Sequence, residues 1–235
     1  MNNVVVFDLG GTLMEYEGMP LSWIPYYEAG MAAVNQNLGL ELSQEELEDA
    51  VRVLKEYNPR FRPREVEYPP EQIFSDAMTR WSRKADLQQV VEEFFRGIKL
   101  VPRIYEDTLP GLHSLRKRGY KLACLTNLPS AMPDSLFRRG ISQLVDALDL
   151  YVSSETCGFR KSNRAGLDQI AEYFQVPVQS LLFVGDEEID AQTAKNAGCS
   201  FVWMNRRNQD RSWGQKNSVK TLEELLAPGF LVEGP

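Results

Sequence analysis

Two apolar runs in this sequence end in carboxylates. The first, Val4–Phe7, is followed by Asp8, and the second, Leu181–Val184, is followed by a glycine and then by four carboxylates between Asp186 and Asp190. Such a cluster of negative charge is costly unless a cation neutralises it, and carboxylate oxygens suit a hard divalent ion. We therefore predict a divalent-metal site where these two runs end side by side.

A hydroxyl, an amide and an ammonium group also follow apolar runs of the chain. Thr126 and Asn127 follow the second apolar run of the chain, and Lys161 opens the helix-length segment after the third. Gly10 and Gly11, after the first run, would let the backbone approach a ligand closely. Because open α/β sheets bind ligands at the carboxyl ends of their strands, all five residues are predicted to line one site.

Five apolar runs predict the strands that must position these residues. They are Val4–Phe7, Lys121–Leu125, Leu148–Val152, Leu181–Val184 and Ser200–Met204. Hydrophobicity without alternation is typical of strands buried on both faces of a parallel sheet. The helix-length segments between and after them are Leu109–Arg118, Ser130–Arg139, Ala165–Phe174, Ala191–Ala197 and Leu222–Leu226. Strands that alternate with helices predict an α/β fold with a doubly wound parallel sheet.

The stretch from about residue 15 to 101 breaks this alternation. It shows helical periodicity in four segments and no credible strand: Trp23–Leu38, Gln44–Tyr57, Glu71–Ala85 and Leu87–Ile98. Ser43 followed by Glu46 forms a capping box that opens the second segment. We predict an all-helical insert of residues 15–101 within a core of residues 1–14 and 102–235.

The composition limits which partners the protein can bind and in which cellular compartment it is expected. A net charge of −7 argues against nucleic acid and anionic membranes as partners and leaves a small anionic substrate open. No apolar run approaches the ~18 residues of a membrane span, and the first residues lack the basic start of a signal peptide. Cys124, Cys157 and Cys199 are typical of reduced packing residues, so we expect a cytoplasmic protein. A homodimer stays open.

In order and spacing, the candidate residues resemble the four motifs of the haloacid dehalogenase superfamily. These motifs are an Asp-x-Asp-x-Thr loop, a strand ending in Thr or Ser, a Lys, and a Gly-Asp-x-x-x-Asp loop. They correspond here to Asp8 with Thr12, to Thr126, to Lys161, and to Asp186 with Asp190. The insert resembles the helical cap of the family's first cap class. The resemblance implies a Rossmann-like core and a magnesium-dependent phosphatase acting on a small phosphorylated molecule.

The resemblance also implies roles for the catalytic residues. Asp8 would attack phosphorus and form an aspartyl-phosphate, which splits one difficult displacement into two easier ones. Thr126 and Lys161 would hold the phosphoryl oxygens, the hydroxyl through a hydrogen bond and the ammonium through its charge. Gly11 and Asn127 would lie against the substrate.

The metal site follows from the same resemblance. Mg²⁺ would be held by the carboxylates of Asp8 and Asp186, while Asp190 would orient the water shell of the ion. Gly10 would contribute its backbone carbonyl and also lie next to the substrate. The ion would neutralise charge that otherwise repels the nucleophile.

One position departs from the phosphatase pattern. Gly10 stands where the family carries a second Asp, which protonates the leaving group and activates water, a contribution typically worth about 10²–10⁴-fold. Three interpretations stay open. The chain is a slow phosphatase that favours good leaving groups; or Glu15, Glu17 or Tyr26 replaces the missing acid; or the fold is kept for binding with little or no catalysis.

Other chemistries are less well supported by the residues. Dehalogenases and phosphonate hydrolases of this family also lack the second Asp. Dehalogenases need no metal, whereas this chain keeps Asp186 and Asp190, and the sequence expected around a phosphonate hydrolase's cap lysine is absent. The stretch from Asp8 to Thr12 also resembles a phosphate loop of actin-like sugar kinases, whose second loop is missing. The single histidine, His113, disfavours a histidine-based triad.

Overall fold

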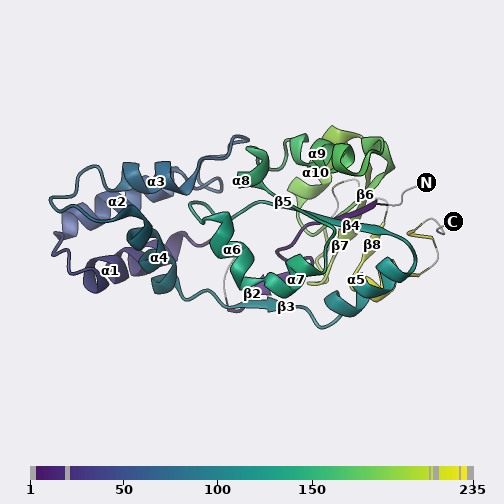
Figure 1. The fold of residues 1–235 in the computed structure, drawn as a ribbon, viewed down its shortest axis with the longest axis horizontal. Helices are drawn as coiled ribbons and strands as arrows, with labels where there is room; N and C mark the ends of the chain where they lie inside the picture. Colours follow the sequence, from purple (N-terminus) through teal and green to yellow (C-terminus); the bar gives the residue numbers. More distant parts are fainter. Residues whose placement is uncertain (1–3, 19–21, 212, 214–216, 228, 232–235) are drawn as a thin grey trace.

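The core of the computed structural model is a parallel sheet of six strands in the order β5-β4-β1-β6-β7-β8 (Figure 1). The structure describes residues 4–18, 22–211, 213, 217–227 and 229–231. The strands are β1 (Val4–Phe7), β4 (Lys121–Thr126), β5 (Leu150–Ser153), β6 (Leu181–Gly185), β7 (Ser200–Met204) and β8 (Ser218–Val219). All five predicted strands are present, and β8 was not predicted because it is only two residues long.

Helices cover both faces of this sheet. On one face lie α9 (Ala165–Phe174) and α10 (Glu188–Ala197), and on the other α5 (Thr108–Lys117) and α11 (Leu222–Leu225). Along β1, Val4 and Val6 pack on the first face, while Val5 and Phe7 pack on the second. Both side-chain directions are buried, which explains the absence of polar alternation in the sequence. The predicted doubly wound α/β fold is confirmed.

A second lobe is built from helices (Figure 1). It holds η1 (Ile24–Tyr26), α1 (Tyr27–Asn37), α2 (Gln44–Glu56), α3 (Pro70–Ala77) and α4 (Leu87–Ile98). The predicted capping box opens α2, since Ser43 and Glu46 bond each other's backbone N–H. Phe74 and Phe94 pack edge to face at 5.2 Å in the lobe's interior, where such pairs add to the stability gained from burial.

A two-stranded antiparallel ribbon joins the lobes and corrects one prediction. Strand β2 (Met14–Tyr16) pairs with β3 (Pro102–Ile104), so the stretch from residue 15 to 101 does contain strand residues. Strands of three residues are too short to show an apolar pattern. The proposed domain limits at residues 14/15 and 101/102 fall within or beside this ribbon and stay a prediction.

Several predicted helix limits also shift. Helix α6 (Asp134–Gly140) begins four residues later than predicted, because Pro133 occupies its N-cap and the residue before a proline avoids helical geometry. Helix α3 ends at Ala77 instead of residue 85. The short elements α7 (Ser142–Asp146), α8 (Ser154–Cys157) and η2 (Val178–Ser180) were not predicted.

Two observations bear on the sequence-based expectations about environment. Among the described residues, no helix has both the length and the apolar character needed to cross a membrane. Cys124, Cys157 and Cys199 are free in the structure, and Cys124 is buried in the core.

Candidate active site

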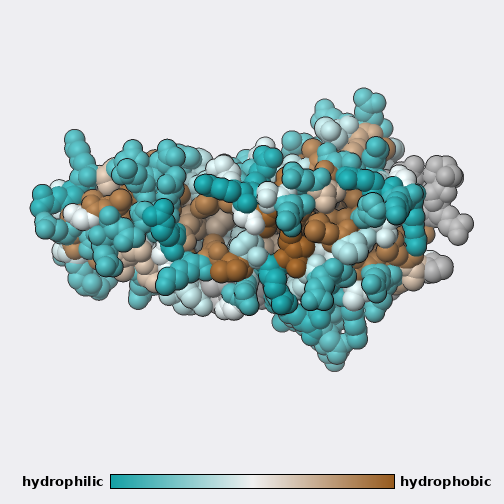
Figure 2. All heavy atoms as spheres, turned by 60° about the horizontal axis from the view of Figure 1, so that its bottom comes forward, coloured by the Kyte–Doolittle hydropathy of each residue, from teal (hydrophilic) through white to brown (hydrophobic). Residues whose placement is uncertain are grey.

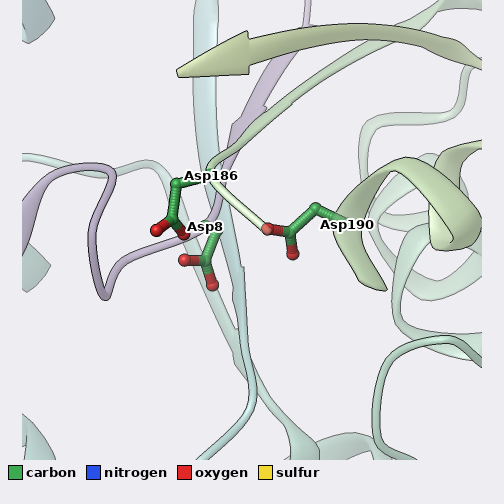
Figure 3. Close-up of side chains that lie close together, drawn as sticks. All are labelled: Asp8, Asp186 and Asp190. Carbon is green, nitrogen blue, oxygen red and sulfur yellow. The ribbon is translucent and has the colours of Figure 1, made fainter. Parts of the chain in front are cut away.

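Strand register brings the carboxylates of the first and fourth motifs together. Phe7 at the end of β1 pairs with Val184 of β6, so Asp8 and Asp186 leave neighbouring strands at the same edge of the sheet. Oxygens of Asp8, Asp186 and Asp190 all lie within 4.8 Å of one another (Figure 3). The structure therefore brings residues 8 and 186 together, and their sharing of a divalent ion stays a prediction.

Lys161 lies between two of these carboxylates. Its Nζ atom is 2.5 Å from Oδ1 of Asp8 and 2.5 Å from Oδ1 of Asp190, and all three side chains are buried. The other oxygen of Asp190 accepts the backbone N–H of Glu187 at 3.0 Å. Both oxygens of Asp190 are thus engaged, and this residue holds Lys161 and the loop after β6 in place.

The charge balance of the cluster leaves room for a cation. Three carboxylates face one ammonium, and Oδ1 of Asp186 is buried with no hydrogen-bond partner among the described residues. Burial raises the pKa of Asp8 to about 7 against the opposing effect of Lys161, and burial together with Asp8 and Asp190 raises the pKa of Asp186 well above its usual range. An oxygen-rich, under-neutralised pocket of this kind fits a hard divalent ion.

Two contacts fix the position of Asp186. The indole N–H of Trp203 on β7 donates to the backbone carbonyl of Asp186 at 3.1 Å. Gly11 has a φ of +81°, and a Cβ at this position would lie 2.1 Å from Oδ2 of Asp186. Glycine is required here both by the left-handed backbone and by the close approach of the carboxylate.

Gly11→Ala should therefore weaken cation binding. The methyl group must displace the Asp186 carboxylate and also strain the left-handed backbone. We therefore expect the free energy of unfolding to fall by about 1–3 kcal/mol and Mg²⁺ to stabilise the variant less than the wild type. Thermal unfolding with and without Mg²⁺ measures both effects. Gly10→Ala is the matched control, because a Cβ at Gly10 meets nothing within 4 Å. Equal Mg²⁺ responses in the two variants would contradict the role assigned to Gly11.

The second-motif residues differ in what they contact. Thr126 is buried at the end of β4, and no side-chain hydrogen bond of its hydroxyl is found among the described residues. Asn127 uses its side-chain amide on the backbone of Lys161: Oδ1 accepts the N–H at 2.8 Å, and Nδ2 donates to the carbonyl at 3.3 Å. Asn127 thus holds Lys161 directly, and its predicted contact with substrate stays a prediction.

Gly10 is exposed next to this cluster. Three residues are candidates for replacing the missing acid, Glu15, Glu17 and Tyr26, and none of them has a hydrogen bond to Asp8 or Lys161 in the structure. Glu15 on β2 is bonded to Arg103 at 3.2 Å and to the Tyr105 hydroxyl at 3.0 Å. Glu17 is exposed, and Tyr26 packs half-buried against the apolar core. In this arrangement the structure offers no clear substitute for the missing carboxylate among these three.

The segment between α2 and α3, residues 58–69, connects the helical lobe to the site. Arg60 pairs with Glu187 in the loop after β6 at 2.9 Å, while Arg62 pairs with Glu56 and Arg64 with Glu67. The sequence carries no signal that would pair Glu187 with a partner 127 residues away. The arginines of this segment are therefore bound to carboxylates of the chain itself.

A cavity of about 360 Å³ lies at the waist between the lobes, lined by α4, α6 and the ribbon, where Figure 2 shows hydrophobic surface. Its lining includes Tyr16, Phe95 and Phe137 and none of the four predicted motifs. It is therefore separate from the carboxylate cluster.

Comparison with known proteins agrees with this geometry. A model of the haloacid dehalogenase-like hydrolases matches residues 3–198. The phosphoglycolate phosphatase of Nitrosospira multiformis is 34% identical over 114 residues, covering 44% of this chain and 49% of that protein. That of Vibrio vulnificus strain YJ016 is 32% identical over 121 residues, covering 50% and 51%. The chain thus spans about half the length of the curated relatives it matches.

Solved structures share the fold over nearly the whole chain. A 2-haloacid dehalogenase from Pseudomonas syringae superimposes with a TM-score of 0.66 at 22% identity, covering 96% of both chains. A phosphatase of the family from Thermococcus onnurineus gives 0.62 at 23% identity, covering 95% of both. The four motifs lie at one edge of the sheet, and the family model matches most of this chain. The chain therefore belongs to the haloacid dehalogenase-like hydrolases.

Proposed function

We propose that this chain is a magnesium-dependent phosphoric-monoester hydrolase that works through an aspartyl-phosphate on Asp8, with weakened acid–base catalysis. The observation that carries the proposal is the cluster of Asp8 and Asp186, in which one buried carboxylate oxygen has no partner among the described residues. Mg²⁺ held by these two carboxylates, with the Gly10 carbonyl as a further ligand, would neutralise charge between the nucleophile and the phosphoryl group.

The residues of the chain supply the remaining chemistry. An oxygen of Asp8 attacks phosphorus, the bond from phosphorus to the leaving oxygen breaks, and water then cleaves the aspartyl-phosphate to give inorganic phosphate. The ammonium of Lys161, which lies 2.5 Å from Asp8, would hold a phosphoryl oxygen, and the buried hydroxyl of Thr126 would bond another. Asp190 keeps Lys161 in position.

The substrate is proposed to be a small phosphorylated metabolite. Two curated relatives are named phosphoglycolate phosphatases, which makes phosphoglycolate the first natural substrate to assay. Since no carboxylate stands at Gly10, substrates whose leaving group departs without protonation should react fastest. Aryl phosphates belong to this class.

A second candidate is a binding protein on the same fold with little or no catalysis. The observation in its favour is the missing side chain at Gly10. A dehalogenase-like reaction needs no metal, and it is disfavoured by the retained carboxylate of Asp186, whose buried Oδ1 has no hydrogen-bond partner among the described residues.

Hydrolysis of an aryl phosphate separates these functions. We expect turnover with Mg²⁺ and a rate at least 100-fold lower after the ion is removed with EDTA. Loss of the cation leaves the nucleophile among unneutralised carboxylates, and a 100-fold loss corresponds to an activation barrier higher by about 3 kcal/mol. Mass spectrometry of acid-quenched protein should find the phosphoryl group on the peptide that contains Asp8. Activity that is indifferent to Mg²⁺ would contradict the metal-dependent mechanism, and the absence of any activity would favour the binding protein.

A further inference from the structure

The segment of residues 58–69 forms a short ladder with the chain just before Lys161. Val66 makes an antiparallel bridge with Phe159. The N–H of Glu67 donates to the carbonyl of Gly158 at 3.0 Å, and the N–H of Arg160 donates to the carbonyl of residue 65 at 2.6 Å. The helical lobe is therefore bonded, through its backbone, to the residue that precedes the ammonium of the active site.

The side chain of Glu67 lies at the centre of this contact. It is buried, with 7% of its side chain exposed. Oε2 accepts bonds from Nη1 of Arg160 and from the hydroxyl of Ser154 at 2.5 Å, and Oε1 accepts bonds from Arg64 at 2.9 Å and from the N–H of Tyr68 at 3.1 Å. One carboxylate thus pairs with two guanidinium groups, and both of its oxygens accept hydrogen bonds.

Both partners of Oε2 hold the chain after β4. Nη2 of Arg160 donates to the backbone carbonyl of Leu128 at 2.9 Å, and the backbone N–H of Leu128 donates to Oγ of Ser154 at 3.0 Å. Leu128 follows Asn127, whose amide bonds both backbone groups of Lys161. A continuous set of hydrogen bonds therefore runs from Glu67 to the backbone that carries the active-site lysine.

Removal of the Glu67 charge would leave a buried cation without its counter-charge. The side chain of Arg160 is only 6% exposed, and its burial lowers the pKa of the guanidinium, an effect that Glu67 opposes. A buried pair broken on one side forces the remaining ion to move toward water or another partner. Movement of Arg160 would shift its neighbour Lys161 relative to Asp8.

We propose that Glu67 is a positioning residue of the hydrolase: through Arg160, Ser154 and Leu128 it fixes the ammonium of Lys161 against Asp8. The proposal rests on the phosphatase function proposed above, in which Lys161 holds a phosphoryl oxygen. It makes the helical lobe a part of the catalytic apparatus, because the site is complete only while residues 58–69 are docked.

The test is Glu67→Gln, which keeps the shape and the acceptor oxygen but removes the charge. With an aryl phosphate and saturating Mg²⁺, we expect kcat to fall about 10–100-fold, the scale of a misplacement near 1 Å. Inhibition by orthovanadate, which reports on phosphoryl binding, should weaken about 10-fold, while the Mg²⁺ concentration for half-maximal activity stays unchanged. Glu67→Asp should recover part of kcat.

Glu65→Gln is the matched control. The carbonyl of Glu65 belongs to the ladder and is unchanged by this substitution. Its side chain is exposed and accepts a bond from Asn163 at 3.0 Å, so the kcat and vanadate inhibition of the variant should equal those of the wild type. Should Glu67→Gln fail to fold, Ser154→Ala removes a neutral member of the same network, and its kcat should fall about 3–10-fold.

The possible failures are distinguishable. A folded Glu67→Gln or Ser154→Ala variant with wild-type kcat and vanadate inhibition overturns the role of Glu67 and leaves the phosphatase function intact. A wild-type chain that neither hydrolyses aryl phosphates nor binds vanadate overturns both proposals.

Discussion

Gly10→Asp should raise the rate at which this chain hydrolyses alkyl phosphates by about 10²–10⁴-fold, the usual contribution of general acid–base catalysis. The substitution is sterically allowed, because a Cβ at Gly10 meets nothing within 4 Å and the backbone is outside the left-handed region. The new carboxyl group would stand two residues after Asp8, where the family places its proton donor. Steady-state kcat/KM for an alkyl phosphate measures the gain.

The gain should depend on the leaving group. An alkoxide is a poor leaving group unless it is protonated, whereas a nitrophenolate leaves without help, so the aryl substrate should gain much less in its first step. Gly10→Asn is the control, since it adds the same volume and cannot transfer a proton. Equal rates for the Asp and Asn variants would mean that another residue already serves as the acid or that proton transfer does not limit the rate.

The missing carboxylate also affects the second half of the reaction. In the family pattern it activates the water that cleaves the aspartyl-phosphate, so the wild type should accumulate this intermediate on good substrates. A burst of released phenol before steady turnover is the kinetic sign of such accumulation. The burst should shrink in Gly10→Asp, because hydrolysis of the intermediate is then accelerated as well.

The convergence of Asp8 and Asp186 could be predicted from sequence because few rules decide it. Apolar runs without alternation require parallel strands, parallel strands end at one edge, and that edge binds ligands. The identity of the polar residue after each run then gives the contents of the site. This argument needs only the order of elements along the chain, which short-range patterns determine.

The contacts between the lobes could not be predicted in this way. Glu67 and Arg160 are 93 residues apart, and Arg60 and Glu187 are 127 apart. A charged residue in an irregular segment has the same sequence signature whether it is solvated or buried in an ion pair. Only the docking of residues 58–69 onto the core distinguishes the two, and no periodicity encodes that docking.

The role of Asn127 shows a different limit. An amide after a strand suits a substrate contact and a structural contact equally well, and the residue type alone cannot separate them. In the structure both amide atoms bond the backbone of Lys161. Trp203 is similar, since an indole in an apolar run predicts only burial, whereas its N–H holds the carbonyl of Asp186.

Asp8→Asn should abolish hydrolysis, with a loss in kcat of about 10⁶-fold, the scale seen when a covalent nucleophile is removed. The amide cannot attack phosphorus, and the substitution also removes one of the charges proposed to hold the cation. Hydrolysis of an aryl phosphate with Mg²⁺ is the measurement. Asp168→Asn on α9, an exposed member of an ion pair with Arg164, is the control and should keep wild-type activity.

The same substitution should stabilise the metal-free fold at neutral and alkaline pH. The pKa of Asp8 is raised from 3.8 to about 7, chiefly by burial, so the folded state favours the protonated form. Below about pH 4 the carboxyl is protonated in both the folded and the unfolded chain and costs nothing. Between pH 4 and 7 the unfolded chain ionises first, and the free energy of unfolding falls as the pH rises.

Thermal unfolding in EDTA tests this consequence. The unfolding temperature of Asp8→Asn minus that of the wild type should grow from about pH 4 to about pH 7 and then level off. Mg²⁺ should shrink the difference at pH 8, because the ion neutralises the Asp8 carboxylate in the wild type. Curves that stay parallel over this range would show that Asp8 is ionised at no cost. A growing difference would mean that the ionised carboxylate of Asp8 lowers the free energy of unfolding, which is the cost expected when a site keeps a buried charge for function instead of stability.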